Sequence, residues 1–221
     1  MSNFKIKYEP SISVIVSHYK EDLKWVDDYF PEHFKIYVYT KSNDKPNLDR
    51  PFEHKYLKNV GRNDHSYLYH IINNYNSLSD INIFITGSSN SLSHKLKCLN
   101  SVMKNLHTKD LQPTWNLDGK YVKGMRTFSI KGESWCASDR RNRSDCRVIG
   151  SEFINLGDFM DKVIQLGDIH KLIWWGVFSV KKNRILNHDK SFYEKIIKHL
   201  EYGDNIETSH FMERLWAMIF S

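Results

Sequence analysis

Cysteine is scarce in this sequence, with three residues among 221, at positions 98, 136 and 146. An odd number at irregular spacing, with no Cys-x-x-Cys pair, indicates neither a disulfide framework nor a zinc knuckle. It favours a reducing compartment. The 11 histidines are dispersed and no His-Glu-x-x-His is present, so we expect no tightly held structural metal.

Long apolar runs and blocks of like charge are also missing. The first residues, "MSNFKIKYEP", lack the apolar stretch of a signal peptide, and no later run approaches the length that spans a bilayer. We therefore expect a cytoplasmic protein with no transmembrane segment. The net charge of +6 comes from scattered residues. It suits phosphate-bearing small molecules, nucleic acid or an anionic membrane equally, so nucleic acid is not favoured as a partner.

Glycine and proline are few, at 10 and 5 residues, and neither a linker nor a repeat interrupts the chain. Apolar residues make up 40% of the sequence, which is enough for one substantial core. These numbers predict a single domain over residues 1–221.

The first half of the chain alternates between strand and helix patterns. Apolar, β-branched runs predict strands at 12–16, 34–41, 53–59 and 81–87, and helical spacing predicts helices near 64–75 and 92–106. This order is typical of an α/β fold with a mainly parallel sheet flanked by helices.

The second half is less regular. Residues 119–130 read as a strand and 137–147 as an exposed basic loop. A short helix is expected within 153–167, then an apolar strand and a turn within 172–186. Two further helices are expected: 188–203, with Asp189 as cap and Gly203 as stop, and the apolar closing segment 208–220.

Polar turns follow each of the first four predicted strands: "SHYKED", "TK", "NVGRND" and "TGSSNS". In a parallel sheet, ligands bind where such turns leave the carboxyl ends of the strands. The sequence therefore predicts one crevice of nucleotide size at this edge.

The turn from Asn59 to Asp64 has two interpretations. In the first, Gly61 lets the backbone approach a ligand, and Arg62 meets a carboxylate or phosphate at the start of a helix. In the second, Asn63 or Asp64 simply caps the helix and Arg62 is solvated. Composition alone favours the second.

Gly87 and Ser88, in the fourth turn, have the same ambiguity. Small residues there suit an anion held by backbone N–H groups. The segment lacks the length and the lysine of a P-loop, the phosphate-binding loop of nucleoside triphosphatases, and a plain Gly-Ser turn explains it equally well.

Three further groups of residues are candidates for chemistry. Glu213 is a carboxylate on an apolar helix, where it is either functional or ion-paired. His18, Glu21 and Asp22 follow the first strand, although acidic residues there commonly serve the helix dipole. Trp174, Trp175 and Phe178 surround Gly176; they suit a sugar face, but a hydrophobic core suits them better.

Four segments, taken in order, resemble a family known only as a domain of unknown function, which is itself similar to GT-A-type glycosyltransferases. They are "VIVSHYKEDLKWV", "NVGRNDHSYLYHIINNYNSLSDINIFITG", "GVFSVKKNRILNHDKSFYEKII" and "MERLWAMIF". The resemblance covers most of the chain apart from residues 112–150.

The resemblance implies a GT-A-like (Rossmann-like) fold with a nucleotide-sugar site. It places His18, Tyr19, Glu21, Asp22, Asn59, Gly61 and Arg62 at the nucleotide-sugar end, and Glu213 and Trp216 in the closing motif. GT-A enzymes commonly hold Mn²⁺ or Mg²⁺ through Asp-x-Asp after the fourth strand. Here that position reads Thr86-Gly87-Ser88-Ser89.

We therefore expect a glycosyltransferase that moves a sugar from a nucleotide-diphosphate donor to a glycan or other hydroxyl acceptor, with Glu213 or Asp22 as base. Basic residues would replace the metal, either Arg62 or the loop with Arg140, Arg141 and Arg143. The alternative is a non-catalytic module of the same fold that binds nucleotide sugars or glycans. Nucleic-acid binding is a third and weaker possibility.

Overall fold

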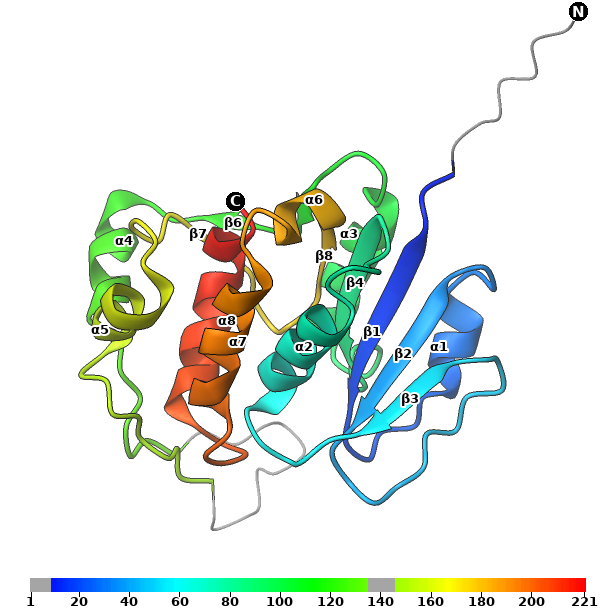
Figure 1. The fold of residues 1–221 in the computed structure, drawn as a ribbon, viewed down its shortest axis with the longest axis horizontal. Coiled ribbons are helices and arrows are strands. Elements are labelled where there is room, and N and C mark those ends of the chain that lie inside the picture. Colours follow the sequence, from blue (N-terminus) through cyan, green and yellow to red (C-terminus); the bar gives the residue numbers. More distant parts are fainter. Residues whose placement is uncertain (1–8, 135–145) are drawn as a thin grey trace, which may run out of the picture.

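The computed structural model describes residues 9–134 and 146–221. Its centre is a six-stranded sheet in the order β3-β2-β1-β4-β8-β5 (Figure 1). The strands are β1 (Ile12–His18), β2 (Lys35–Thr40), β3 (Glu53–Tyr56), β4 (Ile81–Thr86), β5 (Leu111–Gln112) and β8 (Phe178–Lys181). The strands β3, β2, β1 and β4 are mutually parallel, whereas β8 runs antiparallel to both β4 and β5. The expected α/β fold with a mainly parallel sheet is confirmed at this level.

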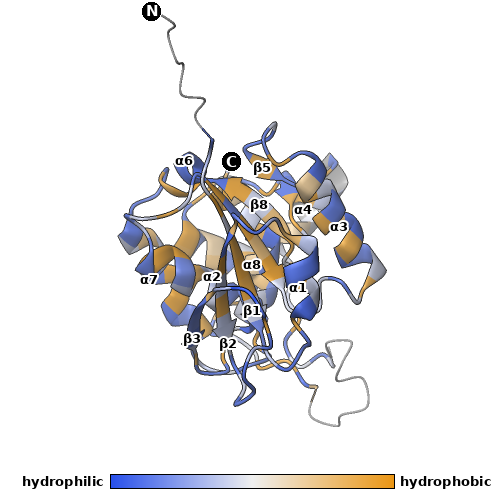
Figure 2. Ribbon diagram, turned by 90° about the vertical axis from the view of Figure 1, so that its right-hand side faces the viewer, coloured by the Kyte–Doolittle hydropathy of each residue, from blue (hydrophilic) through white to orange (hydrophobic). Residues whose placement is uncertain are grey.

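Helices cover both faces of the sheet because the central strands are apolar on both sides (Figure 2). On one face α1 (Lys24–Tyr29) and α3 (Ser93–Lys104) pack on Val14, Val16 and Val38. On the other face α2 (Arg62–Asn73), α7 (Lys190–Ile197) and α8 (Glu207–Ile219) pack around Ile15 and Phe84. Alternation along β1 thus supplies two cores.

The closing helix α8 is the most apolar helix of the second core. Leu215, Trp216 and Phe220 are fully buried there, and the Trp216 ring stacks on Phe220 with centroids 5.4 Å apart. The expected closing helix is confirmed, and so is the helix before it, α7, which has Asp189 at its N-cap position without a side-chain capping hydrogen bond. The helix continues into a 3₁₀ turn, Lys198–Leu200, and so ends three residues before Gly203, the expected stop.

The prediction of a strand at 119–130 is wrong, because this segment contains the helix α4 (Gly119–Arg126). Asp118 precedes it and its carboxylate accepts a hydrogen bond from Tyr121 N at 3.2 Å, which is a helix-capping contact. Met125, near the end of α4, and Phe128, just after it, then pack against the second core.

Between α4 and β8, the described residues form only short elements. The short helix expected within 153–167 is present as α5 (Leu156–Phe159), followed by one π-helical turn at Met160–Ile164. The apolar strand expected within 172–186 is instead two strands, because a turn at Trp174–Gly176 separates β7 (Lys171–Leu172) from β8. β7 pairs with β6 (Trp115–Asn116), and α6 (Lys182–Ile185) follows β8. The basic loop expected at 137–147 lies mostly outside the described residues.

The expectation for the cysteines is wrong at one position, because Cys146 is disulfide-bonded, whereas Cys98 is a free, buried thiol. The argument from cysteine usage for a reducing compartment therefore no longer holds. Within residues 9–134 and 146–221, no helix combines the length and hydropathy needed to cross a membrane.

Glu207, the first residue of α8, ties three segments together. Its fully buried carboxylate accepts hydrogen bonds from Ser129 Oγ at 2.6 Å, Ile130 N at 3.0 Å, and both Ser151 N and Ser151 Oγ at 2.9 and 2.6 Å. Burial opposes ionisation, but these donors outweigh it and hold the pKa of Glu207 below its ordinary value. The carboxylate thus fastens Ser129, Ile130 and Ser151 to the N-terminal end of α8.

We expect Glu207→Ala to lower the free energy of unfolding by roughly 2–5 kcal/mol, because it leaves buried backbone N–H groups without an acceptor. Urea denaturation followed by circular dichroism measures this loss. Glu201→Ala is the matched control, since Glu201 is exposed just before α8. A loss below about 1 kcal/mol in Glu207→Ala would show that water or other groups replace the carboxylate.

Candidate functional site

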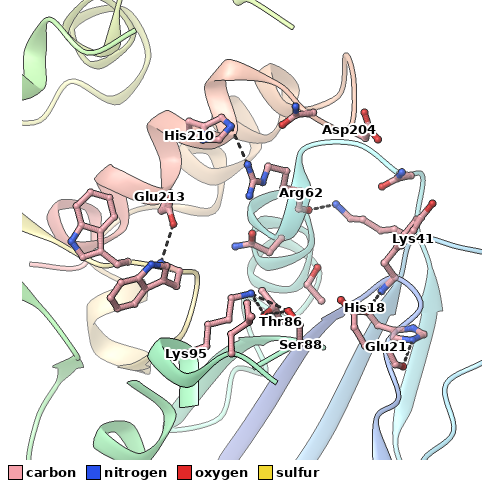
Figure 3. Close-up of a pocket in the computed structure, with 18 of the residues that line it drawn as sticks. His18, Glu21, Lys41, Arg62, Thr86, Ser88, Lys95, Asp204, His210 and Glu213 are labelled. Atoms are coloured by element: carbon pink, nitrogen blue, oxygen red, sulfur yellow. Dashed lines mark hydrogen bonds between the residues drawn. The ribbon is translucent and has the colours of Figure 1, made fainter. Parts of the chain in front are cut away.

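A cavity of about 610 Å³ lies at the carboxyl edge of the parallel strands. It is bordered by Ser17–Tyr19 after β1, Lys41 after β2, Asn59 and Arg62 after β3, and Thr86 and Ser88 after β4. The sequence-based expectation that these corners meet in one crevice is confirmed. Residues of α3, α8 and the Trp174–Gly176 turn close its other side (Figure 3).

The corner after β1 is rigid. His18 is almost fully buried; its Nε2 donates to the Glu21 carbonyl at 3.1 Å, and its Nδ1 lies 3.0 Å from Thr40 Oγ1. Burial lowers the pKa of His18, so the neutral ring fits this arrangement. The Glu21 carboxylate in turn accepts from Tyr19 N and Lys20 N at 2.8 and 3.1 Å. His18 and Glu21 therefore shape the wall and are already occupied with internal partners.

The corner after β3 presents a guanidinium to the cavity. Gly61, at φ +59°, is the N-cap residue of α2, and no side chain caps that helix. The second interpretation of this turn is therefore wrong: Asp64 is buried and accepts from Trp216 Nε1 at 2.7 Å, and Arg62 is not simply solvated. Arg62 Nη1 donates to His210 Nε2 at 3.0 Å.

His210 can accept that bond because it is neutral. Burial, followed by the charges of Arg62 and Arg214, lowers the pKa of His210 to about 3. The imidazole therefore orients the guanidinium without cancelling its charge, and Arg62 stays a cation at the centre of the site (Figure 3).

Lys41 supports the turn that carries Arg62. Its ammonium group donates to the carbonyl oxygens of Val60 and Arg62, and its side chain is buried at 7% exposure. Burial lowers the pKa of Lys41 to about 7, against the opposing effect of Asp64 and Asp204. Lys41 thus fixes the backbone that presents Arg62.

The corner after β4 carries a second cation. Lys95, in the first turn of α3, donates to Thr86 Oγ1 at 2.8 Å and to Ser88 Oγ at 3.0 Å. Lys95 lines the same cavity as Arg62 (Figure 3). The turn that lacks the lysine of a phosphate-binding loop therefore receives one from the next helix.

The α8 side combines a carboxylate with aromatic rings. Glu213 accepts from Trp175 N at 2.9 Å, and its other oxygen lies 3.7 Å from Arg214 Nη1. The Arg214 guanidinium packs over Phe128, 3.7 Å from the ring centroid, and lies 5.3 Å from the centroid of Trp174. The nearby arginine agrees with the ion-paired interpretation of Glu213. The carboxylate also borders the cavity, and a functional role for it stays a prediction.

Trp175 and Gly176 have an unusual backbone, with φ values of +63° and +65°. For a non-glycine residue this region costs roughly 1–2 kcal/mol. At Gly176 an added Cβ would lie 2.5 Å from Asn63 Nδ2, so only glycine fits. Trp175 is 38% exposed as a residue and borders the cavity, whereas Phe178 is core.

The structure brings most, but not all, of the sequence-predicted residues to the cavity. His18, Tyr19, Glu21, Asn59, Arg62, Ser88, Trp175 and Glu213 line it. Asp22 is outside, where its carboxylate accepts from Lys24 N at 2.9 Å and Asn47 Nδ2 at 2.7 Å. Trp216 is fully buried in the core.

The three glycines border other parts of the chain rather than the cavity. An added Cβ would lie 2.6 Å from the Leu200 carbonyl at Gly61, and 2.8 Å from the Glu21 carboxylate at Gly87. Gly61, Gly87 and Gly176 therefore allow close packing of protein on protein. Arg140, Arg141 and Arg143 lie outside the described residues.

The donor set does not fit Mn²⁺ or Mg²⁺. In the part of the chain that the structure describes, no three His, Cys, Asp or Glu residues form a group that could hold a metal ion. After β4, the Thr86 and Ser88 hydroxyls accept from the Lys95 ammonium, a position unsuited to a second cation.

The fold and the site define an α/β protein with a polar, partly aromatic ligand cavity at the carboxyl edge of its parallel strands. The chain belongs to the family described as "Protein of unknown function (DUF3431)", whose model matches residues 13–221. The family membership expected from the four sequence segments is thereby confirmed. No curated protein matches the sequence.

Proposed function

We propose that this protein is a glycosyltransferase whose cavity binds a nucleotide-diphosphate sugar, in a fold of GT-A type. The observation that carries the proposal is the convergence of the turns after β1, β2, β3 and β4 on one cavity that has Arg62 and Lys95 at its centre. A volume of about 610 Å³ is within the range of small-molecule sites.

The order of groups along the cavity matches the parts of such a donor. Figure 3 shows His18, Glu21 and Lys41 on one side, Glu213 on the other, and Arg62 and Lys95 between them. Arg62 and Lys95 would meet the diphosphate, with Arg62 as a planar fork and Lys95 as a compact charge. The nucleoside would then extend toward the β1 corner and the sugar toward Glu213.

Side chains would supply the charge that Asp-x-Asp enzymes take from a metal. In the transfer step, the bond from the sugar C1 to the phosphate oxygen breaks and the nucleoside diphosphate leaves with the electron pair. Preorganised donors such as Arg62 and Lys95 stabilise that charge. In an inverting reaction, Glu213 takes the proton of the acceptor hydroxyl as its oxygen bonds to C1. Asp22, outside the cavity, has no part in this step.

Thermal-shift measurements with UDP-, GDP- and CMP-sugars, with and without Mn²⁺, test the proposal. We expect at least one nucleotide sugar to raise the melting temperature, and the shift to be independent of Mn²⁺. Folded protein that shows no shift with any of them would contradict the donor site. Binding without turnover over a panel of glycan acceptors would instead indicate the non-catalytic module of the same fold.

A nucleic-acid-binding protein would give another result. Its retention on heparin or DNA would fall steeply with salt, and it would show no preference among nucleotide sugars.

A further inference from the structure

Trp175 is held in place more firmly than an exposed side chain needs. Its backbone has the positive φ of +63° that tryptophan rarely adopts, and its amide donates to Glu213 Oε1 at 2.9 Å. Strain of this kind persists where the surroundings enforce it, and it is concentrated at functional sites. Glu213 is one such enforcing group.

Two further rings fix the orientation of the indole. The Trp115 ring lies edge-to-face with it at a centroid distance of 5.6 Å, and the His94 ring lies 4.8 Å away. Even so, 38% of the Trp175 residue surface remains exposed, and the residue lines the cavity. A residue with a fixed, partly exposed indole therefore borders the cavity beside Glu213.

Glu213 stands beside this surface as a hydrogen-bond acceptor. An apolar ring face beside a carboxylate matches the two sides of a pyranose, whose C–H groups pack on an indole while its hydroxyls donate to the carboxylate. A flexible polyol has the hydroxyls but no flat C–H face. His18 and Glu21, at the β1 end of the cavity, lie on the side opposite Glu213 (Figure 3). The nucleoside would bind at that end.

We propose that Trp175 is the platform on which the acceptor stacks, that Glu213 is its positioning residue, and that the acceptor is therefore a pyranose-containing glycan. This inference rests on the proposed function, whose acceptor it narrows from any hydroxyl compound to a carbohydrate ring. The role of Glu213 as base and its role in holding Trp175 involve different oxygens, so the two roles are compatible.

Saturation-transfer NMR with methyl pyranosides of glucose, galactose and mannose tests the platform. We expect transfer to the ring C–H protons of at least one pyranoside, and none to sorbitol. Trp175→Gly removes the indole while accepting the positive φ, so the protein should stay folded, and the pyranoside affinity should fall roughly tenfold. Tyr121→Ala is the control, because Tyr121 is an exposed aromatic side chain on α4, outside the cavity.

Two substitutions of Glu213 separate its roles. Glu213→Gln keeps an oxygen that can accept from Trp175 N, so pyranoside binding should stay within about twofold while transfer is lost. Glu213→Ala should weaken pyranoside binding as well. Equal pyranoside affinity in wild type and Trp175→Gly, or loss of nucleotide-sugar rather than pyranoside binding in Trp175→Gly, would overturn the platform.

The failure of this inference is distinguishable from the failure of the proposed function. Nucleotide-sugar binding without Trp175-dependent pyranoside binding would leave the donor site intact and overturn the platform alone. Trp175-dependent pyranoside binding without any nucleotide-sugar shift would support the platform and contradict the transferase.

Discussion

Replacing Arg62 by alanine should weaken binding of a nucleotide-diphosphate sugar roughly 10- to 100-fold, because a charge-assisted hydrogen bond contributes about 1.5–3 kcal/mol. The turn itself should survive, since Lys41 holds it through the backbone carbonyls of Val60 and Arg62 and not through the guanidinium. Arg62→Lys keeps the charge without the planar fork, and its affinity should fall between the two. Isothermal titration calorimetry with the sugar that gives the largest thermal shift measures all three.

Lys95 allows a tighter control of the same prediction. Lys95→Ala should also weaken binding about tenfold, whereas Lys97→Ala removes an exposed lysine from the same helix and should leave the affinity unchanged. If the affinity were equal in wild type, Arg62→Ala and Lys95→Ala, the diphosphate could not lie against the centre of this cavity. If Lys97→Ala weakened binding as much as Lys95→Ala, general surface charge would explain the effect.

The place of the site was predictable from the sequence for a geometrical reason. Parallel strands put their carboxyl ends at one edge, so the turns containing His18, Asn59 and Ser88 had to meet there. Individual roles were less predictable. Asp22 and Glu21 are neighbours in sequence, yet only Glu21 borders the cavity, and no local pattern separates them.

The residues that sequence reasoning missed come from outside the turns. Lys95 reaches back from nine residues beyond Thr86, and His210 and Arg214 come from the closing helix. A signal existed for Lys95, because a lysine in the first turn of a helix lies near the turn that precedes it. None existed for His210, since its contact with Arg62 joins residues 148 positions apart.

Trp216 and α4 show where prediction from the sequence pattern fails. Trp216 and Glu213 are three residues apart on one helix, yet one is core and the other borders the cavity, since only tertiary packing decides how far each face is covered. Residues 119–126 contain tyrosine and valine, which are common in strands, but the Asp118 cap and the contact of Met125 with the core favour a helix.

Acid should unfold this protein early, with a midpoint at about pH 3.5–5, because its buried histidines are neutral in the fold. Burial is the largest cause that lowers the pKa of His65, His70 and His210 to about 3. Each therefore stabilises the fold fully above the unfolded pKa near 6.5 and loses that contribution as pH falls toward 3.

Asp64 has the opposite effect on stability over part of this pH range. Burial raises its pKa to about 7, against the hydrogen bond from Trp216, so its contribution is full below the unfolded pKa of about 3.9 and is lost as pH rises through 7. Near pH 5, unfolding takes up three protons on the histidines and releases one from Asp64. The net uptake of two protons corresponds to a loss of roughly 3 kcal/mol per pH unit.

His70→Phe tests this account, because aromatic rings of Tyr37, Tyr39 and Phe84 surround His70 and should accept another ring. The loss of the 2.9 Å contact with the Tyr39 hydroxyl sets a new baseline, so the slope of unfolding free energy against pH is the informative quantity. Between pH 4 and 6 that slope should fall by about 1.4 kcal/mol per pH unit, one proton's worth. His107→Phe, at an exposed position, should keep the wild-type slope. An unchanged slope in His70→Phe would mean that His70 is already protonated in the folded protein, in spite of its burial.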